Sequence, residues 1–358
     1  MMGAFWMKIT RRRFIRNVSI GAGSFFLAPT KLSSGLLPGL GNGLLEREAA
    51  KTKVLGIGGA GCNVVEYMLK SRLAEADFVV ADADERSLAD VPRANKLLIG
   101  EQTKVRPFCS APPEWCRKAA MDDEQLIRKT LQGSDLVCVV AGMGGGIGTG
   151  ATPVVLRIAK GMKILTIAVV TRPFPLEGKR SGTIAGKGLE EIGRIADFTV
   201  LIPYDRLLCM LAPETTLKEA YQAGTRMLAR GVGGIVDLIR SGEQAMLDGD
   251  FEYVRPFFAE SGLALMGFGI GDTLTKAMET ALSCPLLDHE VLRRTEKLFI
   301  TFTVSNKTIL PEFEWAYGLL RDKLREDVNI IWGVGGIKEQ PAVTLYATSL
   351  IPDPALFV

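Results

Sequence analysis

A glycine-rich stretch, residues 142–150, offers the clearest chemistry in this sequence. It holds six glycines in nine residues, follows the apolar run 136–140 and precedes the helix-like pattern of residues 153–159. A strand, a glycine loop and a helix together bring bare backbone N–H groups around a phosphate. Glycine suits such a loop because a Cβ atom would block the phosphate and because positive φ is cheap only without one. No Lys-Ser/Thr pair follows, so the stretch is not a P-loop.

A second glycine turn, residues 58–63, ends a short apolar strand and opens a helix over residues 64–69. Two acids, Asp82 and Asp84, follow the next apolar run, residues 78–81. Ligands of open α/β sheets bind at the carboxyl ends of the strands. The second turn and the two acids therefore indicate a ligand site shared with the first glycine stretch.

The remaining pattern predicts an α/β protein in two parts joined by a long central helix. In the first part strands alternate with helices, including a helix expected at 121–132, which predicts a parallel, Rossmann-like nucleotide-binding sheet. The helical pattern of residues 217–239 is long enough to connect two domains, and a smaller α+β unit follows it. The expected divisions are an N-terminal extension at 1–50, a nucleotide-binding domain at 51–212, a central helix at 213–240 and a C-terminal domain at 241–358.

Composition narrows the classes of function. The chain of 358 residues is 47% hydrophobic and 23% charged, as in ordinary globular proteins. A net charge of +3, without a basic stripe carrying aromatic residues, argues against a nucleic-acid partner. Six scattered cysteines and a single histidine, His289, argue against a metal site built from side chains and favour free thiols in a reducing compartment.

The first fifty residues have a different character. Residues 10–28 combine a basic head, with an arginine pair followed by Phe14, and an apolar stretch too short to span a bilayer as a helix. The segment is similar to a twin-arginine export signal. A basic, amphiphilic membrane tether and an extension produced by an upstream start site are the alternatives. Residues 29–50 have the composition of a linker.

The two glycine loops and the central helix together resemble the FtsZ/tubulin superfamily, most of all its bacterial FtsZ branch. Residues 173–178, 202–208 and 264–267 also fit the FtsZ pattern in order. The resemblance covers roughly residues 52–351. It implies binding of GTP or GDP with Mg²⁺ and a C-terminal activation domain. It also implies head-to-tail filaments of this protein, or of this protein with other FtsZ-family subunits, in which one subunit completes the nucleotide site of the next.

The glycine loops and the resemblance together assign the nucleotide-binding residues. Asn63 corresponds to a residue that hydrogen-bonds the base, Tyr221 to one that stacks on it, and Glu177 to an acid near the ribose. The hydroxyl of Thr149 is expected either to contact a phosphate or to cap a helix, and a capping role is also open for Asn63. The full expected set is Gly58, Gly59, Gly61, Asn63, Asp82, Asp84, Gly142, Gly144, Gly145, Gly146, Gly148, Thr149, Gly150, Glu177, Tyr204 and Tyr221.

Three acids after the central helix are the expected catalytic residues. The resemblance matches Asp248 and Asp250 to polar residues that face the next subunit's γ-phosphate, and Glu252 lies beside Tyr253, which occupies the position of a further acid. Two of the chain's other departures from the FtsZ pattern concern the base and the phosphates. Arg226 stands where an acid reads guanine, and residues 105–113 contain no glycine.

Two functions are therefore expected as alternatives. The first is a slow GTPase of the cytoskeletal or cell-division type in the cytoplasm, at the division site or at the membrane through residues 10–28. The second is a catalytically degenerate nucleotide-binding scaffold or a regulator of FtsZ filaments. Export through the N-terminal segment is the alternative location.

Overall fold

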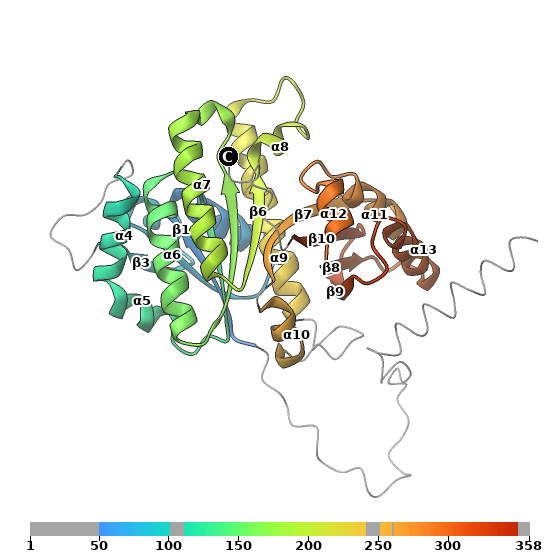
Figure 1. The fold of residues 1–358 in the computed structure, drawn as a ribbon, viewed down its shortest axis with the longest axis horizontal. Coiled ribbons are helices and arrows are strands. Elements are labelled where there is room, and N and C mark those ends of the chain that lie inside the picture. Colours follow the sequence, from blue (N-terminus) through green and yellow to red (C-terminus); the bar gives the residue numbers. More distant parts are fainter. Residues whose placement is uncertain (1–49, 101–110, 241–250, 260, 350–358) are drawn as a thin grey trace, which may run out of the picture. The chain divides into compact units, whose positions relative to one another are not determined.

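The computed structural model describes residues 50–100, 111–240, 251–259 and 261–349 (Figure 1). Their ten strands form one sheet in the order β3-β2-β1-β4-β5-β6-β7-β10-β8-β9. The strands are β1 (Thr52–Ile57), β2 (Asp77–Asp82), β3 (Asn95–Leu98), β4 (Leu136–Gly142), β5 (Leu165–Arg172), β6 (Phe198–Pro203), β7 (Gly262–Ile270), β8 (Lys297–Val304), β9 (Asn329–Ile337) and β10 (Ala342–Ser349).

The first seven strands in this order are parallel, as the alternating pattern predicts. The β1, β4, β5 and β6 strands are buried almost throughout, which explains their uninterrupted apolar runs. The direction changes at β10, which runs antiparallel to both β7 and β8, and β9 then pairs in parallel with β8. One continuous sheet thus joins the nucleotide-binding half to the smaller α+β half.

Helices cover both faces of the sheet. One face packs against α4 (Pro113–Asp122), α5 (Glu124–Leu131), α6 (Gly146–Gly161), α7 (Gly178–Ile195), α11 (Leu274–Leu282), α12 (His289–Arg294) and α13 (Leu310–Arg321). The other packs against α2 (Gly58–Ser71), α3 (Glu85–Ala89), α8 (Tyr204–Leu208), α9 (Leu217–Arg240) and α10 (Phe251–Phe258). A short 3₁₀ turn, η1 (Pro175–Glu177), precedes α7.

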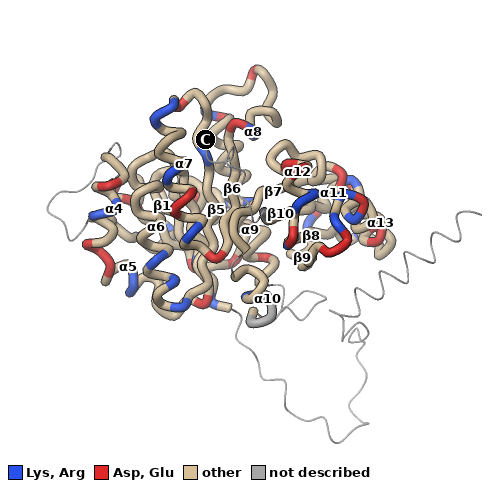
Figure 2. Tube along the Cα trace, in the orientation of Figure 1, with Lys and Arg blue, Asp and Glu red and all other residues tan. Residues whose placement is uncertain are grey.

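Charged residues of both signs lie along α4, α5 and α7, whereas α6 carries basic residues alone (Figure 2). Arg117 of α4 and Arg157 of α6 both donate to the carboxylate of Glu191 on α7, at 2.7 and 2.5 Å. The Arg117 guanidinium holds the pKa of Glu191 below its usual range despite partial burial. These contacts tie together three helices, one of which begins in the glycine-rich stretch.

The central helix α9 spans 24 residues and contacts strands of both halves. The buried hydroxyl of Tyr346 donates to the Gly231 carbonyl at 2.7 Å, and that of Thr301 donates to the Gly234 carbonyl at 2.8 Å. A Cβ at Gly234 would lie 2.4 Å from the Tyr346 hydroxyl, so glycine is required for this approach. Among the described residues, no helix is both long and apolar enough to cross a membrane.

The structure differs from the expected elements in three places. The helix expected at 121–132 is interrupted at Asp123, whose buried carboxylate accepts the Gly100 N–H at 2.5 Å. The β3 and β7 strands were not predicted; β7 contains glycines against which α11 packs closely. The helix after β4 begins at Gly146, so the loop itself is shorter than the glycine-rich stretch. Residues 10–28 lie outside the described residues.

Candidate nucleotide-binding site

Two helix N-termini meet at the carboxyl edge of the parallel strands. The β1 strand runs directly into α2, and β4 reaches α6 through a short loop. A Cβ at Gly58, whose φ is +72°, would lie 3.3 Å from the amide nitrogen of Gly148. The first N–H groups of each helix have no partner inside the helix, and the helix dipoles favour negative charge there. Two such ends in contact make a strong anion site.

The predicted glycines divide into two groups. Gly59 and Gly145 are exposed, and a Cβ at either would meet no atom within 4 Å. At the others, apart from Gly58, packing requires glycine, because a Cβ would press on neighbouring atoms. The closest such approaches are 2.5 Å at Gly61 and Gly144, 2.9 Å at Gly142, and 2.2 Å at Gly146, Gly148 and Gly150. Room for a phosphate therefore exists at Gly59 and Gly145, which together with the starts of α2 and α6 we call the cradle.

Two hydroxyl groups hold the loop between β4 and α6. The N–H of Gly144, whose φ is +102°, donates to the buried Thr149 hydroxyl at 2.9 Å. The Ser181 hydroxyl of α7 donates to the Gly144 carbonyl at 3.3 Å. Thr149 lies inside α6, whose N-cap is Gly145, so the helix-capping alternative for Thr149 is wrong. Ser181 was not among the predicted site residues, since a lone serine carries no signal of its own.

The two acids after β2 differ in environment. Asp82 is buried, accepts the N–H groups of Ala83 and Asp84 at 2.7 and 3.1 Å, and has a pKa raised by burial. Burial, together with the Asp82 charge, raises the pKa of the Cys62 thiol of α2 to about 12 and that of the Cys116 thiol of α4 to about 11. Asp82 thus lies near both α2 and α4, beside the cradle.

Asp84 has a local structural role. It caps α3 by accepting the Arg86 N–H at 3.0 Å, and it also pairs with the Arg86 guanidinium. These bonds hold the pKa of the half-buried Asp84 carboxyl below its usual range. The Asp84 side chain is therefore occupied by Arg86, whereas the Asp82 carboxylate accepts the backbone N–H groups of the two residues that follow it.

Three aromatic rings lie beside the cradle. Phe174 contacts Tyr204 at 4.5 Å and Tyr221 at 5.2 Å between ring centroids. Tyr204 is buried, whereas Tyr221 of α9 is 40% exposed and presents a ring on which a base could stack. Glu177 accepts the Phe174 N–H at 2.9 Å and hydrogen-bonds Tyr221. Phe174 was part of a recognised motif but was not predicted as a site residue.

These rings are close to the glycine loop. A Cβ at Gly144 would lie 3.2 Å from Pro173, the residue before Phe174. Asn63 is exposed on α2, six residues into a helix whose N-cap is Ile57, so its capping alternative is wrong. The structure therefore gathers the predicted residues of the first half at one edge of the sheet.

Of the predicted catalytic acids, Glu252 alone belongs to the described residues, and its helix α10 lies at the opposite edge of the sheet. Asp248 and Asp250 lie outside the described residues, and Glu252 is placed through the backbone of α10. The Arg255 guanidinium of α10 donates at 2.8 Å to the carbonyl of Lys163, which precedes the start of β5. The cradle lies at the other end of these strands, about 20 Å away for strands of six or seven residues. Glu252 is therefore remote from the cradle of its own chain.

The residues at the cradle fit a nucleotide with Mg²⁺. Open glycines and two helix N-termini suit phosphates, and Asp82 is a carboxylate beside them. The described residues contain no group of three side chains able to hold a metal ion. Such a group is not required, because Mg²⁺ keeps several waters and binds through one or two carboxylates and the substrate phosphates.

Comparisons with known proteins agree with this geometry. Residues 51–212 match the Tubulin/FtsZ family GTPase domain, and residues 262–348 match the FtsZ family C-terminal domain. The cell division protein FtsZ of Buchnera aphidicola subsp. Acyrthosiphon pisum (strain APS) is 34% identical over 304 residues, covering 83% of this chain and 79% of the relative.

Solved structures show the same fold. A structure described as an empty FtsZ dimer from M. jannaschii superposes with a TM-score of 0.79 at 31% identity, covering 85% of this chain and 90% of that one. CetZ2 from Haloferax volcanii, at 20% identity and a TM-score of 0.70, covers 86% of this chain and 96% of its own and shares the fold. With both family domains matched in order and relatives above 30% identity, this chain belongs to the FtsZ family of the tubulin superfamily.

Proposed function

We propose that this protein binds GTP in the cradle, assembles head to tail and hydrolyses GTP slowly where two subunits meet. The placement of α10 at the edge of the sheet opposite the cradle carries this proposal. An acid on α10 is far from its own nucleotide, but it faces the cradle of the next copy when copies stack along the strands. The curated relatives named as cell division proteins support a role in division.

In this proposal the chain acts mainly by positioning, which is what phosphoryl transfer requires. Backbone N–H groups at Gly59 and Gly145 bind the phosphates, Tyr221 stacks on the base, and Asn63 hydrogen-bonds its edge. Asp82 would hold Mg²⁺, which neutralises charge on the phosphates when bound. Asp248, Asp250 and Glu252 of the adjacent copy orient the attacking water. The oxygen of this water bonds to the γ-phosphorus while the bond from that phosphorus to the β–γ bridging oxygen breaks. GDP leaves with the bridging oxygen, phosphate leaves with the water's oxygen, and one proton of the water passes to solvent.

The same proposal places the protein in the cytoplasm at the division site, with residues 10–28 as a membrane contact. Its partners are further copies of itself and other FtsZ-family subunits.

A nucleotide-binding scaffold without hydrolysis is the second candidate, and the start of α4 favours it. The helix begins at Pro113 after Pro112, and a Cβ at Gly146 would lie 2.2 Å from the Ala111 carbonyl. The start of α4 is therefore adjacent to the cradle. Prolines have no N–H to donate, so α4 offers fewer donors to a terminal phosphate than a glycine loop would.

Phosphate release measured over a series of protein concentrations separates the two candidates. Assembly-dependent hydrolysis predicts that the rate per subunit rises with concentration and that protein pellets with GTP. A scaffold predicts binding with a flat rate near background. If the purified protein neither carries nor binds a guanine nucleotide, the GTPase is refuted; if it neither carries nor binds any nucleotide, identified by mass, the scaffold is refuted as well.

A further inference from the structure

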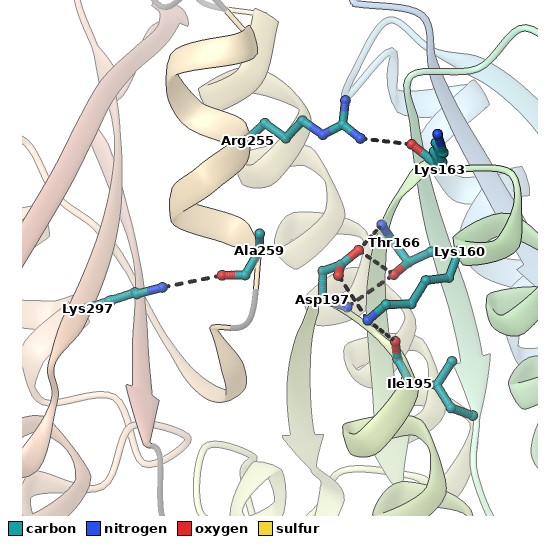
Figure 3. A network of polar contacts seen from close by, with 8 residues as sticks. All are labelled: Lys160, Lys163, Thr166, Ile195, Asp197, Arg255, Ala259 and Lys297. Carbon is teal, nitrogen blue, oxygen red and sulfur yellow. Dashed lines mark hydrogen bonds and ion pairs between the residues drawn. The ribbon is translucent and has the colours of Figure 1, made fainter.

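The short helix α10 is anchored to the first half of the sheet by a polar network (Figure 3). Arg255 donates to the Lys163 carbonyl at 2.8 Å. Just beyond α10, the Ser261 N–H donates to the Asp197 carbonyl at 3.0 Å. The Asp197 carboxylate accepts both the N–H and the hydroxyl of Thr166, at 2.9 and 2.7 Å. These bonds fix the C-terminal end of α10 against the starts of β5 and β6.

A lysine from the second half of the sheet meets the same helix end. The half-buried ammonium of Lys297 in β8 donates to the carbonyls of Phe257 and Ala259 at 3.2 and 3.4 Å and to the Ser261 hydroxyl at 3.2 Å. Three acceptors match the three donors of an ammonium group. A cation is also favoured at a helix C-terminus, where carbonyl groups lack partners and carry partial negative charge.

The backbone of Lys297 is itself held in place. Its N–H donates to the Thr348 hydroxyl at 3.2 Å, and that hydroxyl donates to the Lys297 carbonyl at 2.9 Å. The ammonium therefore projects from a strand fixed on β10, and it links α10 to the C-terminal half of the sheet.

Because α10 is short, its orientation is sensitive to the contacts that Lys297 makes. The helix has eight residues, fewer than an isolated helix needs for stability, and Pro256 removes one of its internal hydrogen bonds. Its direction thus depends on tertiary contacts, which are apolar at Phe251 and both apolar and polar at its C-terminal end. Glu252 lies about 9 Å along the helix from Phe258, so a tilt of about 10° about that end displaces it by about 1.5 Å. A misplacement of that size can slow a positioned reaction about a hundredfold.

We infer that Lys297 is a positioning residue for hydrolysis. It orients α10 and so the stretch of backbone that carries Glu252, which acts on the neighbouring subunit in the proposed function. The inference rests on the proposed function. Lys297 contacts neither the nucleotide of its own chain nor the cradle, which lies at the other edge of the sheet. Loss of Lys297 should therefore lower turnover while leaving nucleotide affinity unchanged.

The first test compares Lys297→Met, Lys297→Gln and Lys297→Arg with the unaltered protein. We expect Met and Gln to lower kcat at saturating subunit concentration by about ten- to a hundredfold. The GDP dissociation constant should stay within about twofold. Arg should restore part of the rate, because it keeps a cation that can donate to the carbonyls at the helix C-terminus, although its planar guanidinium does not reproduce the geometry of an ammonium group. Unchanged kcat in both Met and Gln variants would overturn the inference. So would a Lys297→Arg rate as low as that of Lys297→Met.

A mixing experiment distinguishes positioning from a general loss of structure. Lys297→Met subunits keep an intact cradle, and Gly145→Asp subunits, with a carboxylate in the cradle, keep an intact α10. Turnover should recover on mixing, because the second variant presents a correctly oriented α10 to the loaded cradle of the first. The double variant Lys297→Met/Gly145→Asp, added in place of the second, should give no recovery.

The two proposals fail in different ways. Absence of recovery in the first mixture, while the unaltered protein hydrolyses GTP in a concentration-dependent manner, overturns the role of Lys297 alone. A rate in the unaltered protein that does not depend on concentration refutes the proposed subunit-shared hydrolysis. In that case Lys297 has no reaction to position, and the inference falls with it.

Discussion

Replacing Gly145 by aspartate should weaken nucleotide binding at least about tenfold without weakening the fold. Gly145 is exposed, a Cβ there meets no atom within 4 Å, and its φ and ψ of −92° and 178° are open to any residue. Aspartate is moreover a better helix N-cap than glycine by a few tenths of a kcal/mol. The structure therefore predicts an unfolding free energy that is unchanged or slightly higher.

The effect on binding follows from charge. A carboxylate about 5 Å from a phosphate carrying two charges is repelled by about 2 kcal/mol at the dielectric constant of water and by about 7 kcal/mol at an effective value of 20. Each 1.4 kcal/mol is about a factor of ten. Gly145→Asp should thus weaken GDP binding at least about tenfold. Gly145→Asn is the matched control, because it has nearly the same shape and capping ability without the charge.

Calorimetric titration with GDP and chemical denaturation of both variants test this reasoning. We expect Gly145→Asp to bind much more weakly than Gly145→Asn while both unfold at the same denaturant concentration. Equal affinity in the two variants would show that no phosphate lies near Gly145. Destabilisation of both would show that the open space at this residue is needed by the fold.

Two further predictions concern Asp82 and Arg226. Burial raises the pKa of Asp82 in the folded state, so the ionised carboxylate lowers the free energy of unfolding at any pH above that pKa. This destabilisation disappears as the pH falls below the pKa of an aspartate in the unfolded chain, about 3.9. Without nucleotide, Asp82→Asn should raise the unfolding free energy most at neutral pH and converge with the unaltered protein in acid; a pH-independent difference in denaturant titrations would contradict this. The helices α2 and α9 run side by side in the same direction: Leu73, just after α2, lies against Gly233, and Tyr67 lies near Arg230. Asn63 and Arg226 each come four residues earlier in their helices, so they lie at the same height along this helix pair. Because an arginine cannot accept the N–H groups of guanine, GDP and IDP should bind within about threefold, and Arg226→Asp should favour GDP by about tenfold or more, as measured by competition binding; an unaltered protein that strongly prefers GDP to IDP would contradict this.

Much of the fold could be predicted from the sequence because the parallel strands are buried on both faces. Such strands leave uninterrupted apolar runs, as at β4 and β5. The β7 strand escaped prediction because its glycines, which admit α11, dilute the pattern. The break at Asp123 also escaped, since it depends on a bond to Gly100 that is remote in sequence.

The candidate site could be predicted only in part, because glycine serves two different purposes there. Glycine spacing located the cradle, yet it could not distinguish Gly145, which faces open space, from Gly148, which faces the Gly142 carbonyl. Room for a ligand and close approach of another backbone segment both require glycine, so the residue type alone cannot tell the two cases apart. The contact of Ser181 with Gly144 and the placement of Lys297 beneath α10 arise only when strands far apart in the chain are brought together.

The separation of the cradle from α10 also explains why the two sides of the proposed site can be tested independently. Between them lie strands that are buried on both faces, and energetic coupling between remote sites requires an element with two alternative arrangements. A change at Gly145 should therefore leave Lys297 and α10 in place, and a change at Lys297 should leave the cradle able to bind. Each variant then lacks only one half of a site that two subunits assemble, and restoration of turnover on mixing is the outcome that a site contained within a single chain could not produce.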